Sequence, residues 1–243
     1  MSQKRVSSFA TQITRLGLVN AYLVRELDGF TLVDTAIAGT ANTIQSVAQR
    51  THTGPIRRVL LTHAHGDHNG SRDALASQIG GAVGTPVDVA ISQRDARLLP
   101  KKPKQDRSLD PGEPRCKVKG SLPGANTPPS HLVTDGELYG SLRAIATPGH
   151  TPGHFCFLDE RDGTLYAGDA LVTVGGSPHV TGFGPWYFPF PRIATWHRPT
   201  AVESIRKLIN LSDTVPIERI APGHGQVLEG GRDLLETALK RAV

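Results

Sequence analysis

Residues 59–68, Val-Leu-Leu-Thr-His-Ala-His-Gly-Asp-His, place three imidazoles and a carboxylate directly after a short apolar run. These are the ligands that zinc and similar divalent ions prefer in proteins. Alternate residues of an extended loop can turn toward one point, so His63 and His65 can share a metal. Asp67 and His68 lie one step further on and point to a neighbouring position. The stretch therefore predicts two adjacent metals at the end of a strand.

Three more candidate ligands stand in the same local setting as this stretch. His150, Asp169 and His224 each follow a short apolar run and then a Gly or a Pro-Gly pair. Glycine lets the backbone turn sharply beside an ion, and proline fixes the direction in which the chain leaves a strand. Four strand ends are therefore expected to bring their ligands to one rim.

In this order, and preceded by Leu32-Val33-Asp34-Thr35, these residues resemble the metallo-β-lactamase-fold hydrolase superfamily over essentially the whole chain. The resemblance implies an α/β fold, a four-layer αββα sandwich with two metals along one edge. It also implies that His63, His65 and His150 hold the first metal, that Asp67, His68 and His224 hold the second, and that Asp169 bridges them.

Two positions indicate a branch within that superfamily. Aspartate rather than cysteine at 169 is similar to glyoxalase II and the lactonases, and His65 argues against the flavo-diiron branch, which uses a carboxylate there. Asp34 resembles the family's buried aspartate behind the metal loop; the alternative is an ordinary turn residue at a strand exit. His154 could be a ligand by its spacing, but the pattern assigns that role to His150, so we interpret His154 as structural.

The expected chemistry is hydrolysis by a hydroxide that bridges the two metals. Metal coordination lowers the pKa of water from about 15.7 toward about 7, so such a hydroxide is available near neutral pH. It would attack the carbonyl carbon of an ester, lactone or thioester, with Asp67 or Asp169 as the catalytic residue that accepts or passes the proton. Zn²⁺ is the favoured metal, and Mn²⁺ or Fe²⁺ also suits these ligands.

The sequence does not determine which substrate is cleaved. Lactonases of this superfamily carry a tyrosine soon after the bridging aspartate, where this chain has Ala170-Leu171-Val172, and Tyr187 is the candidate replacement. Glyoxalase II proteins carry a C-terminal helical extension with basic residues, and this chain ends nineteen residues after His224. A small-molecule substrate is expected, and its class is not fixed.

Three other functions compete with carbonyl hydrolysis. A phosphodiesterase or nuclease would use the same ligands, but the basic excess lies in one loop and the extra domain of such nucleases is not found. A persulfide dioxygenase would keep a single iron on His63, His65 and His150. A non-enzymatic binding protein is disfavoured, since it has no evident need for the second set of ligands.

Length and composition predict a single domain over residues 1–243, with one sizeable core. Two cysteines, Cys116 and Cys156, form neither a C-x-x-C pair nor a disulfide framework, so no oxidising compartment is required. The chain shows neither a signal peptide nor an apolar span. A cytoplasmic protein with no membrane or nucleic-acid partner is the expectation.

Two irregular stretches are expected to matter for substrate choice. Residues 100–131 are rich in Pro, Gly and Lys and carry +4 of the chain's net charge of +5. They form either a solvated loop, which we favour, or a cover that attracts anions. Residues 183–196 hold six of the thirteen aromatic residues and pack against the core, beside the substrate, or in a homodimer.

The remaining pattern predicts alternating strands and helices in two halves with a mixed sheet. The expected hairpins are 18–25 with 30–34 and 155–158 with 164–167, and the expected helices are 41–50, 69–79, 92–98, 199–210 and 232–241.

Overall fold

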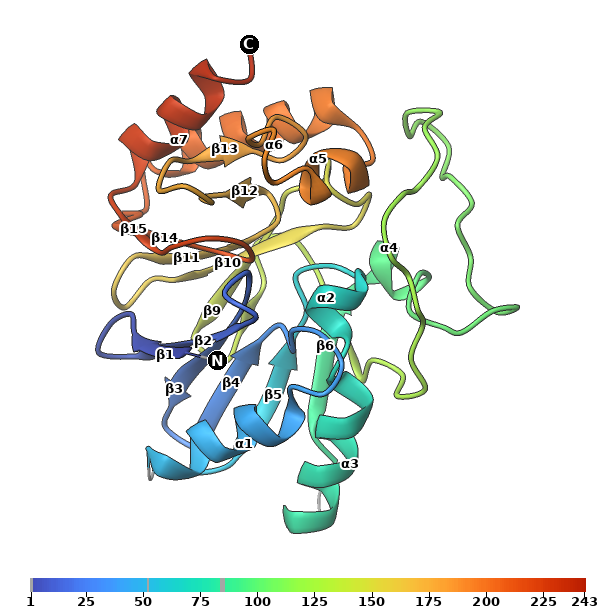
Figure 1. Ribbon diagram of the computed structural model, residues 1–243, viewed down its shortest axis with the longest axis vertical. Helices are drawn as coiled ribbons and strands as arrows, with labels where there is room; N and C mark the ends of the chain where they lie inside the picture. The colour runs from blue at the N-terminus through green and yellow to red at the C-terminus, as the bar shows by residue number, and fades with distance from the viewer. Residues whose placement is uncertain (1, 52, 84–85) are drawn as a thin grey trace.

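Two β-sheets lie face to face in the computed structural model, which describes residues 2–51, 53–83 and 86–243 (Figure 1). The first sheet takes its seven strands in chain order, with antiparallel pairing as far as β4 and parallel pairing from there on. These strands are β1 (Ser2–Arg5), β2 (Ala10–Arg15), β3 (Val19–Glu26), β4 (Gly29–Val33), β5 (Ile56–Leu60), β6 (Asp88–Ser92) and β7 (His131–Val133).

The second sheet has the order β15-β14-β11-β10-β9-β8. It is mixed, because β11 pairs parallel with β14 and antiparallel with β10. A two-stranded ribbon of β12 and β13 lies beside it. The bounds are β8 (Leu138–Tyr139), β9 (Leu142–Ala146), β10 (Phe155–Asp159), β11 (Thr164–Gly168), β12 (Leu171–Val172), β13 (His179–Val180), β14 (Arg219–Pro222) and β15 (Leu228–Glu229).

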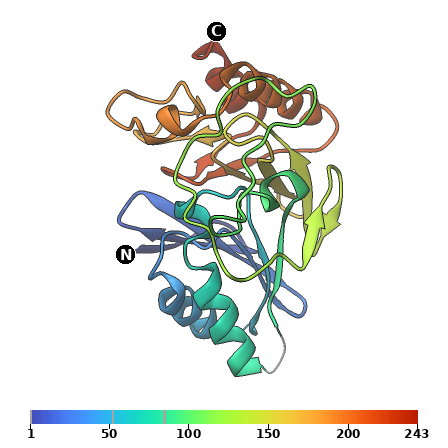
Figure 2. The same ribbon diagram turned by 90° about the vertical axis from the view of Figure 1, so that its right-hand side faces the viewer.

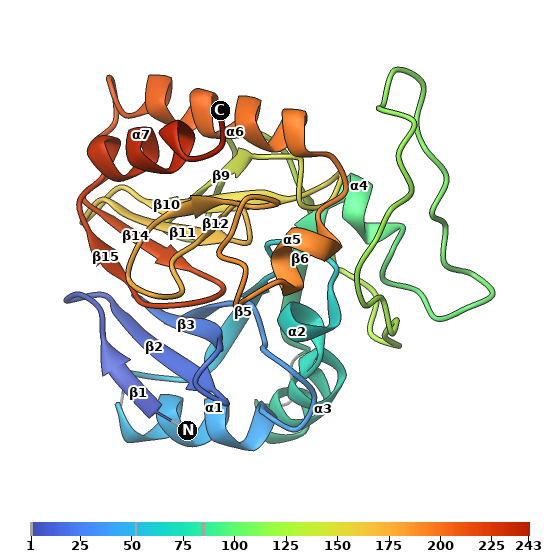
Figure 3. The same ribbon diagram turned by 45° about the horizontal axis from the view of Figure 1, so that its top comes forward.

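Helices cover the outer face of each sheet (Figure 3). On the first sheet these are α1 (Ala41–Arg50) and α3 (Arg72–Val83), and on the second they are α6 (Arg198–Leu211) and α7 (Arg232–Lys240). Three short helices are α2 (Gly66–Asn69), α4 (Gln93–Ala96) and α5 (Phe190–Ala194). The order of layers is therefore αββα, as predicted.

Central strands such as β3 and β5 carry apolar side chains on both faces because each sheet is covered on both sides. On β3, Tyr22 packs between the sheets, whereas Leu23 packs under the helices; on β5, Leu60 and Val59 divide in the same way. Successive side chains of a strand point to opposite faces, so a run without polar interruption suits a sheet buried on both sides. This is why the strands before the predicted ligands are continuous apolar runs.

Both predicted hairpins and the helix 41–50 are confirmed, and the two C-terminal helices agree within one residue at each end. The helix predicted over 69–79 is confirmed only from Arg72, where α3 begins. Asn69 ends α2, and Gly70 and Ser71 lie between the two helices. A side chain at Gly70 would place its Cβ 2.4 Å from the Gly66 carbonyl oxygen and 2.6 Å from the Ala38 nitrogen. The predicted helix 92–98 is also too long: α4 begins after Ser92, its N-cap, and covers only 93–96.

A long segment without regular elements joins α4 to β7, as predicted for 100–131. Within this segment an isolated β-bridge pairs Pro100 with Ala125. Figure 2 shows it crossing one side of the molecule, in green. None of the helices in the described ranges has the length and apolarity needed to cross a membrane.

Candidate metal centre

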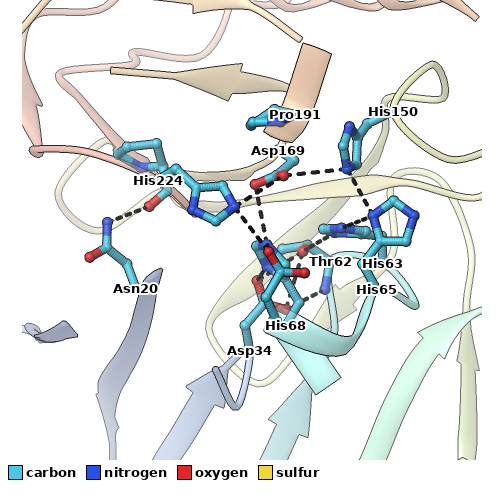
Figure 4. Close-up of polar contacts among 12 residues, drawn as sticks. Asn20, Asp34, Thr62, His63, His65, His68, His150, Asp169, Pro191 and His224 are labelled. Carbon is cyan, nitrogen blue, oxygen red and sulfur yellow. Dashed lines mark hydrogen bonds and ion pairs between the residues drawn. The ribbon is translucent and has the colours of Figure 1, made fainter. Parts of the chain in front are cut away.

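All seven predicted ligands lie together at one edge of the sandwich, where the loops after β5, β9, β11 and β14 meet (Figure 4). Six of them are at most 3 % exposed, and Asp67 is the exception, with 35 % of its side chain exposed. The seven residues are His63, His65, Asp67, His68, His150, Asp169 and His224.

Three imidazole nitrogens face one another in the first group. His63 Nε2 lies 3.1 Å from His65 Nδ1, which lies 2.9 Å from His150 Nε2. Which of these atoms carries a proton follows from the partner of the other ring nitrogen. His65 Nε2 lies 2.9 Å from the Lys119 carbonyl oxygen, which can only accept, so Nε2 donates and Nδ1 is a bare lone pair.

A relay of hydroxyls fixes the tautomer of His150. The Thr195 hydroxyl donates to the Pro191 carbonyl oxygen at 2.6 Å, so it must accept from Thr181, 2.8 Å away. Thr181 therefore accepts from His150 Nδ1 at 2.9 Å, which leaves His150 Nε2 without a proton.

His63 follows the same logic. The Thr62 hydroxyl donates to Asp34 and accepts from His63 Nδ1 at 3.0 Å, so His63 Nε2 is bare as well. Three lone pairs thus converge with no proton between them, and that of His65 lies 3.1 Å and 2.9 Å from the other two nitrogens. Such an arrangement is repulsive by itself and becomes favourable around a cation, so these residues fit a metal ion.

The second group is built in the same way. His68 Nδ1 donates to Asp34 Oδ2 at 2.7 Å, and His224 Nδ1 donates to the Leu18 carbonyl oxygen at 2.9 Å. Their Nε2 atoms face inward, and that of His224 lies 3.3 Å from Asp67 Oδ2. His68 Nε2 is shielded from solvent and has no hydrogen-bond partner among the described residues. The second group therefore also brings nitrogen and oxygen atoms together that could act as ligands of a cation.

Asp169 lies between the two groups. Its Oδ2 is 3.3 Å from His150 Nε2 and 3.4 Å from His224 Nε2, and its Oδ1 is 3.2 Å from His68 Nε2. Oδ1 is buried and has no hydrogen-bond partner in the described part of the chain. A carboxylate in this position can contact an ion in either group.

The two groups differ electrostatically. Burial, and then neighbouring imidazoles, hold the pKa of His63 well below its ordinary value, and burial also lowers the pKa of His65 and of His150. Burial opposes charging of His224 too, but Asp169 and Asp67 raise its pKa to about 10. Without metal the second group therefore retains protons, which a metal ion must displace.

Asp34 and His154 support the ligands from behind. Asp34 accepts from His68 and from the Thr62 backbone N–H at 2.8 Å, which favours the orienting role, although its φ of +59° also makes it a turn residue. His154 Nε2 accepts the Asp169 backbone N–H at 3.0 Å, and burial lowers the pKa of His154 to about 3. His154 thus fixes the backbone of Asp169, in line with its structural interpretation.

Asp95 is a residue of this site that the sequence analysis missed. It is fully buried at the start of α4, where Oδ2 accepts from the Ala64 N–H at 3.0 Å and the Thr151 hydroxyl at 2.7 Å, and Oδ1 accepts from the Gly153 N–H at 2.8 Å. It therefore ties the loop of His63 and His65 to the loop of His150. The one local signal is Ser92 three residues before it, which indicates only a helix cap.

A cavity of about 590 Å³ opens beside the ligands. Its apolar wall consists of Ile37, Phe190, Pro191, Ile193 and Ala194. Lys119, Gly120 and Ser121, from the long irregular segment, close another side, so part of that segment does cover the site.

The aromatic stretch divides among several environments. Phe188 and Trp196 are buried, and Phe190 lines the cavity. Trp186 is 83 % exposed and lines a neighbouring hollow instead of the cavity beside the ligands. Tyr187 is also outside the cavity lining, and its hydroxyl donates to the Val174 carbonyl oxygen.

Comparisons with known proteins agree with this geometry. The chain is 44 % identical over 226 residues to "Uncharacterized protein YobT" of Bacillus subtilis, covering 92 % of this chain and 90 % of the relative. It is 29 % identical to "Probable metallo-hydrolase YflN" of the same organism, covering 91 % and 87 %. The metallo-β-lactamase FIM-1 from Pseudomonas aeruginosa, solved in a mono-zinc form, shares the fold with a TM-score of 0.69 and 18 % identity, over 99 % of this chain and 94 % of that one.

The family model described as "Metallo-beta-lactamase superfamily" matches residues 14–224, which span the four ligand-bearing loops. The chain is therefore a member of the metallo-β-lactamase superfamily of metal-dependent hydrolases.

Proposed function

We propose that this protein is a hydrolase with two divalent metal ions that cleaves an ester, lactone or thioester. The observation that carries the proposal is the convergence of five imidazole nitrogens and two carboxylates at one edge of the sandwich, with three of the nitrogens unprotonated. The ligand assignment is that of the resemblance. His63, His65 and His150 would hold one ion, Asp67, His68 and His224 the other, and Asp169 would contact both.

When bound, two such ions supply a nucleophile from water near neutral pH and polarise the carbonyl oxygen of the substrate. The two carboxylates of the chain divide the remaining work according to their exposure. Asp169 is buried and its backbone N–H is bonded to His154, so it would serve to hold the two ions in position. Asp67 lies at the rim, where its partly exposed oxygens can receive a proton and pass it to solvent.

The cavity supports a substrate with an apolar acyl part. Phe190 and Ile193 are exposed by 66 % and 67 % although they face the cavity, so an acyl chain can cover them. Removing apolar surface from water would then favour binding by roughly 25 cal/mol per Å² buried. This property favours carbonyl substrates over phosphodiesters, whose charge an apolar wall does not compensate.

Zinc is the proposed metal, because a set of imidazoles and carboxylates suits it, and Mn²⁺ and Fe²⁺ accept the same ligands. The mono-zinc form of FIM-1 supports zinc by analogy of fold, and the name of YflN, a probable metallo-hydrolase, supports a metal without specifying which one.

The first experiment is elemental analysis of the purified protein, together with a panel of esters, lactones, thioesters and an aryl phosphodiester. The expected result is two metal equivalents per chain and hydrolysis within the carbonyl series. Rates should rise with acyl length. One iron per chain with oxygen uptake and no hydrolysis would instead identify a dioxygenase.

Asp169→Ala tests the bridging role. We expect loss of one or both metal equivalents and of turnover, with the far-ultraviolet circular dichroism unchanged. Asp233→Ala, an exposed aspartate on α7, is the matched control and should keep both metals. Full turnover in Asp169→Ala would refute the assignment.

A further inference from the structure

Arg72, the first residue of α3, is buried without a partner for its charge. It is 1 % exposed, and its Nε and Nη1 atoms are shielded and make no hydrogen bond to any described residue. A guanidinium carries five N–H donors, and leaving a buried charge unpaired costs several kcal/mol. The neighbouring Asp73 acts on this charge only through space, because its oxygens accept the backbone N–H groups of Asn126 and Thr127 at 2.8 to 3.0 Å.

The guanidinium borders a cavity of about 510 Å³ that is strongly basic. Lys101, Lys102 and Lys104 contribute to its wall, and no ion pair joins any of them to a described residue. The lining contains no carboxylate, and Asn126 and Thr127 add uncharged polar groups. Four cationic residues thus line a space whose described wall carries no carboxylate.

We propose that this cavity is a binding site for a small oxyanion of the phosphate type. Interactions between cationic side chains and an oxyanion are stronger than those between neutral partners, because both groups are charged. The three ammonium groups favour a doubly charged phosphate over a singly charged carboxylate. A bound anion would offset the buried charge of Arg72 from the cavity that this residue lines.

The site is separate from the metal centre, since the two cavities share no lining residue. The segment 119–129 joins them, with Lys119 against His65 at one end and Asn126 beside Arg72 at the other. Phosphate can also bind metal ions, so the test must distinguish the two locations.

The test is calorimetric titration of the metal-loaded protein with inorganic phosphate at low ionic strength. Arg72→Met is compared with Arg115→Met. The control removes the same charge from an exposed position in the irregular segment 100–131, outside the cavity lining. We expect the wild type and Arg115→Met to bind phosphate alike, and Arg72→Met to bind at least about tenfold more weakly. Acetate should bind more weakly than phosphate to the wild type. Equal phosphate affinity in Arg72→Met and the wild type would place phosphate elsewhere and overturn the proposal.

Thermal unfolding gives a second readout. Added phosphate should raise the Tm of the wild type but not that of Arg72→Met, because a ligand that binds only the folded state stabilises it. If Arg72→Met does not fold, the double variant Lys101→Gln/Lys104→Gln replaces it, since both side chains are exposed. It should also lose phosphate affinity, and wild-type affinity in this variant would refute the basic cavity as the site.

Discussion

Replacing Asp95 by asparagine should weaken binding of the first metal without touching a single ligand. The carboxylate accepts three hydrogen bonds from the two loops that carry His63, His65 and His150. Asparagine has nearly the same shape but only one oxygen. If that oxygen takes the place of Oδ2, the bonds from the Ala64 N–H and the Thr151 hydroxyl remain. The new amide NH₂ then faces the Gly153 N–H, so two donors oppose each other and the third hydrogen bond is lost.

The magnitude follows from that single mismatch. One buried backbone N–H without an acceptor costs about 1–3 kcal/mol of folding free energy. Because the Gly153 end of the tie loosens, the His150 loop is free to move relative to His63 and His65. Losing a partner behind a metal ligand typically lowers metal affinity by about 10- to 100-fold, and we expect a value in that range.

The assay is competition for zinc with a chromophoric chelator, combined with thermal unfolding of the metal-free protein. Asp159→Asn is the matched control, because Asp159 is equally buried but bonds to Arg161, away from every ligand. Both variants should unfold at lower temperature, and Asp95→Asn alone should lose metal affinity. If Asp95→Asn is destabilised and yet binds zinc within about twofold of the wild type, the positioning role is refuted.

Two further predictions concern the same centre. Gly120→Ala should abolish binding of the first metal, because its Cβ would lie 2.0 Å from His65 Nε2. Gly112→Ala, at the same φ of +88° with no atom within 4 Å, should bind metal normally in the same chelator assay, and equal metal loss in both would point to backbone strain instead. The metal-free protein should lose stability as pH rises from about 7 toward 10, since the pKa of His224 is raised to about 10 when folded and its proton contributes most at low pH. In the metal-loaded protein this loss should be absent, and denaturant unfolding at a series of pH values with and without chelator compares the two; a metal-free protein that gains stability over this range would contradict the sign.

The layers of the fold could be predicted because local pattern and burial agree. Continuous apolar runs such as Leu60 with its neighbours require a sheet covered on both faces, and the ligands follow directly at the strand ends. The break between α2 and α3 could not be predicted in this way. At this break Gly70 lies against Ala38, in a loop whose position only the folded chain defines.

The ligands themselves were predictable, but their supports were not. His63 and its partners belong to a motif with a chemical reason for its spacing, whereas Asp95 acts on residues 31 and 58 positions away in sequence. Composition alone likewise could not separate Trp186, which is exposed, from Phe190, which lines the cavity. Residue type indicates which chemistry a side chain can perform, and tertiary contacts determine whether that side chain lies at the site.

The carbonyl of Lys119 makes the irregular segment a part of the metal centre, because it fixes the ring of His65. Loops around an active site are where families acquire new substrates, since the scaffold tolerates their change. In this protein the stretch from Lys119 to Ser121 tolerates less change, because a substitution there would also disturb the His65 ring and therefore metal binding. Adaptation to a new substrate would proceed more readily through the side chains of Phe190 and Ile193 on α5, which line the cavity and are not among the seven ligands.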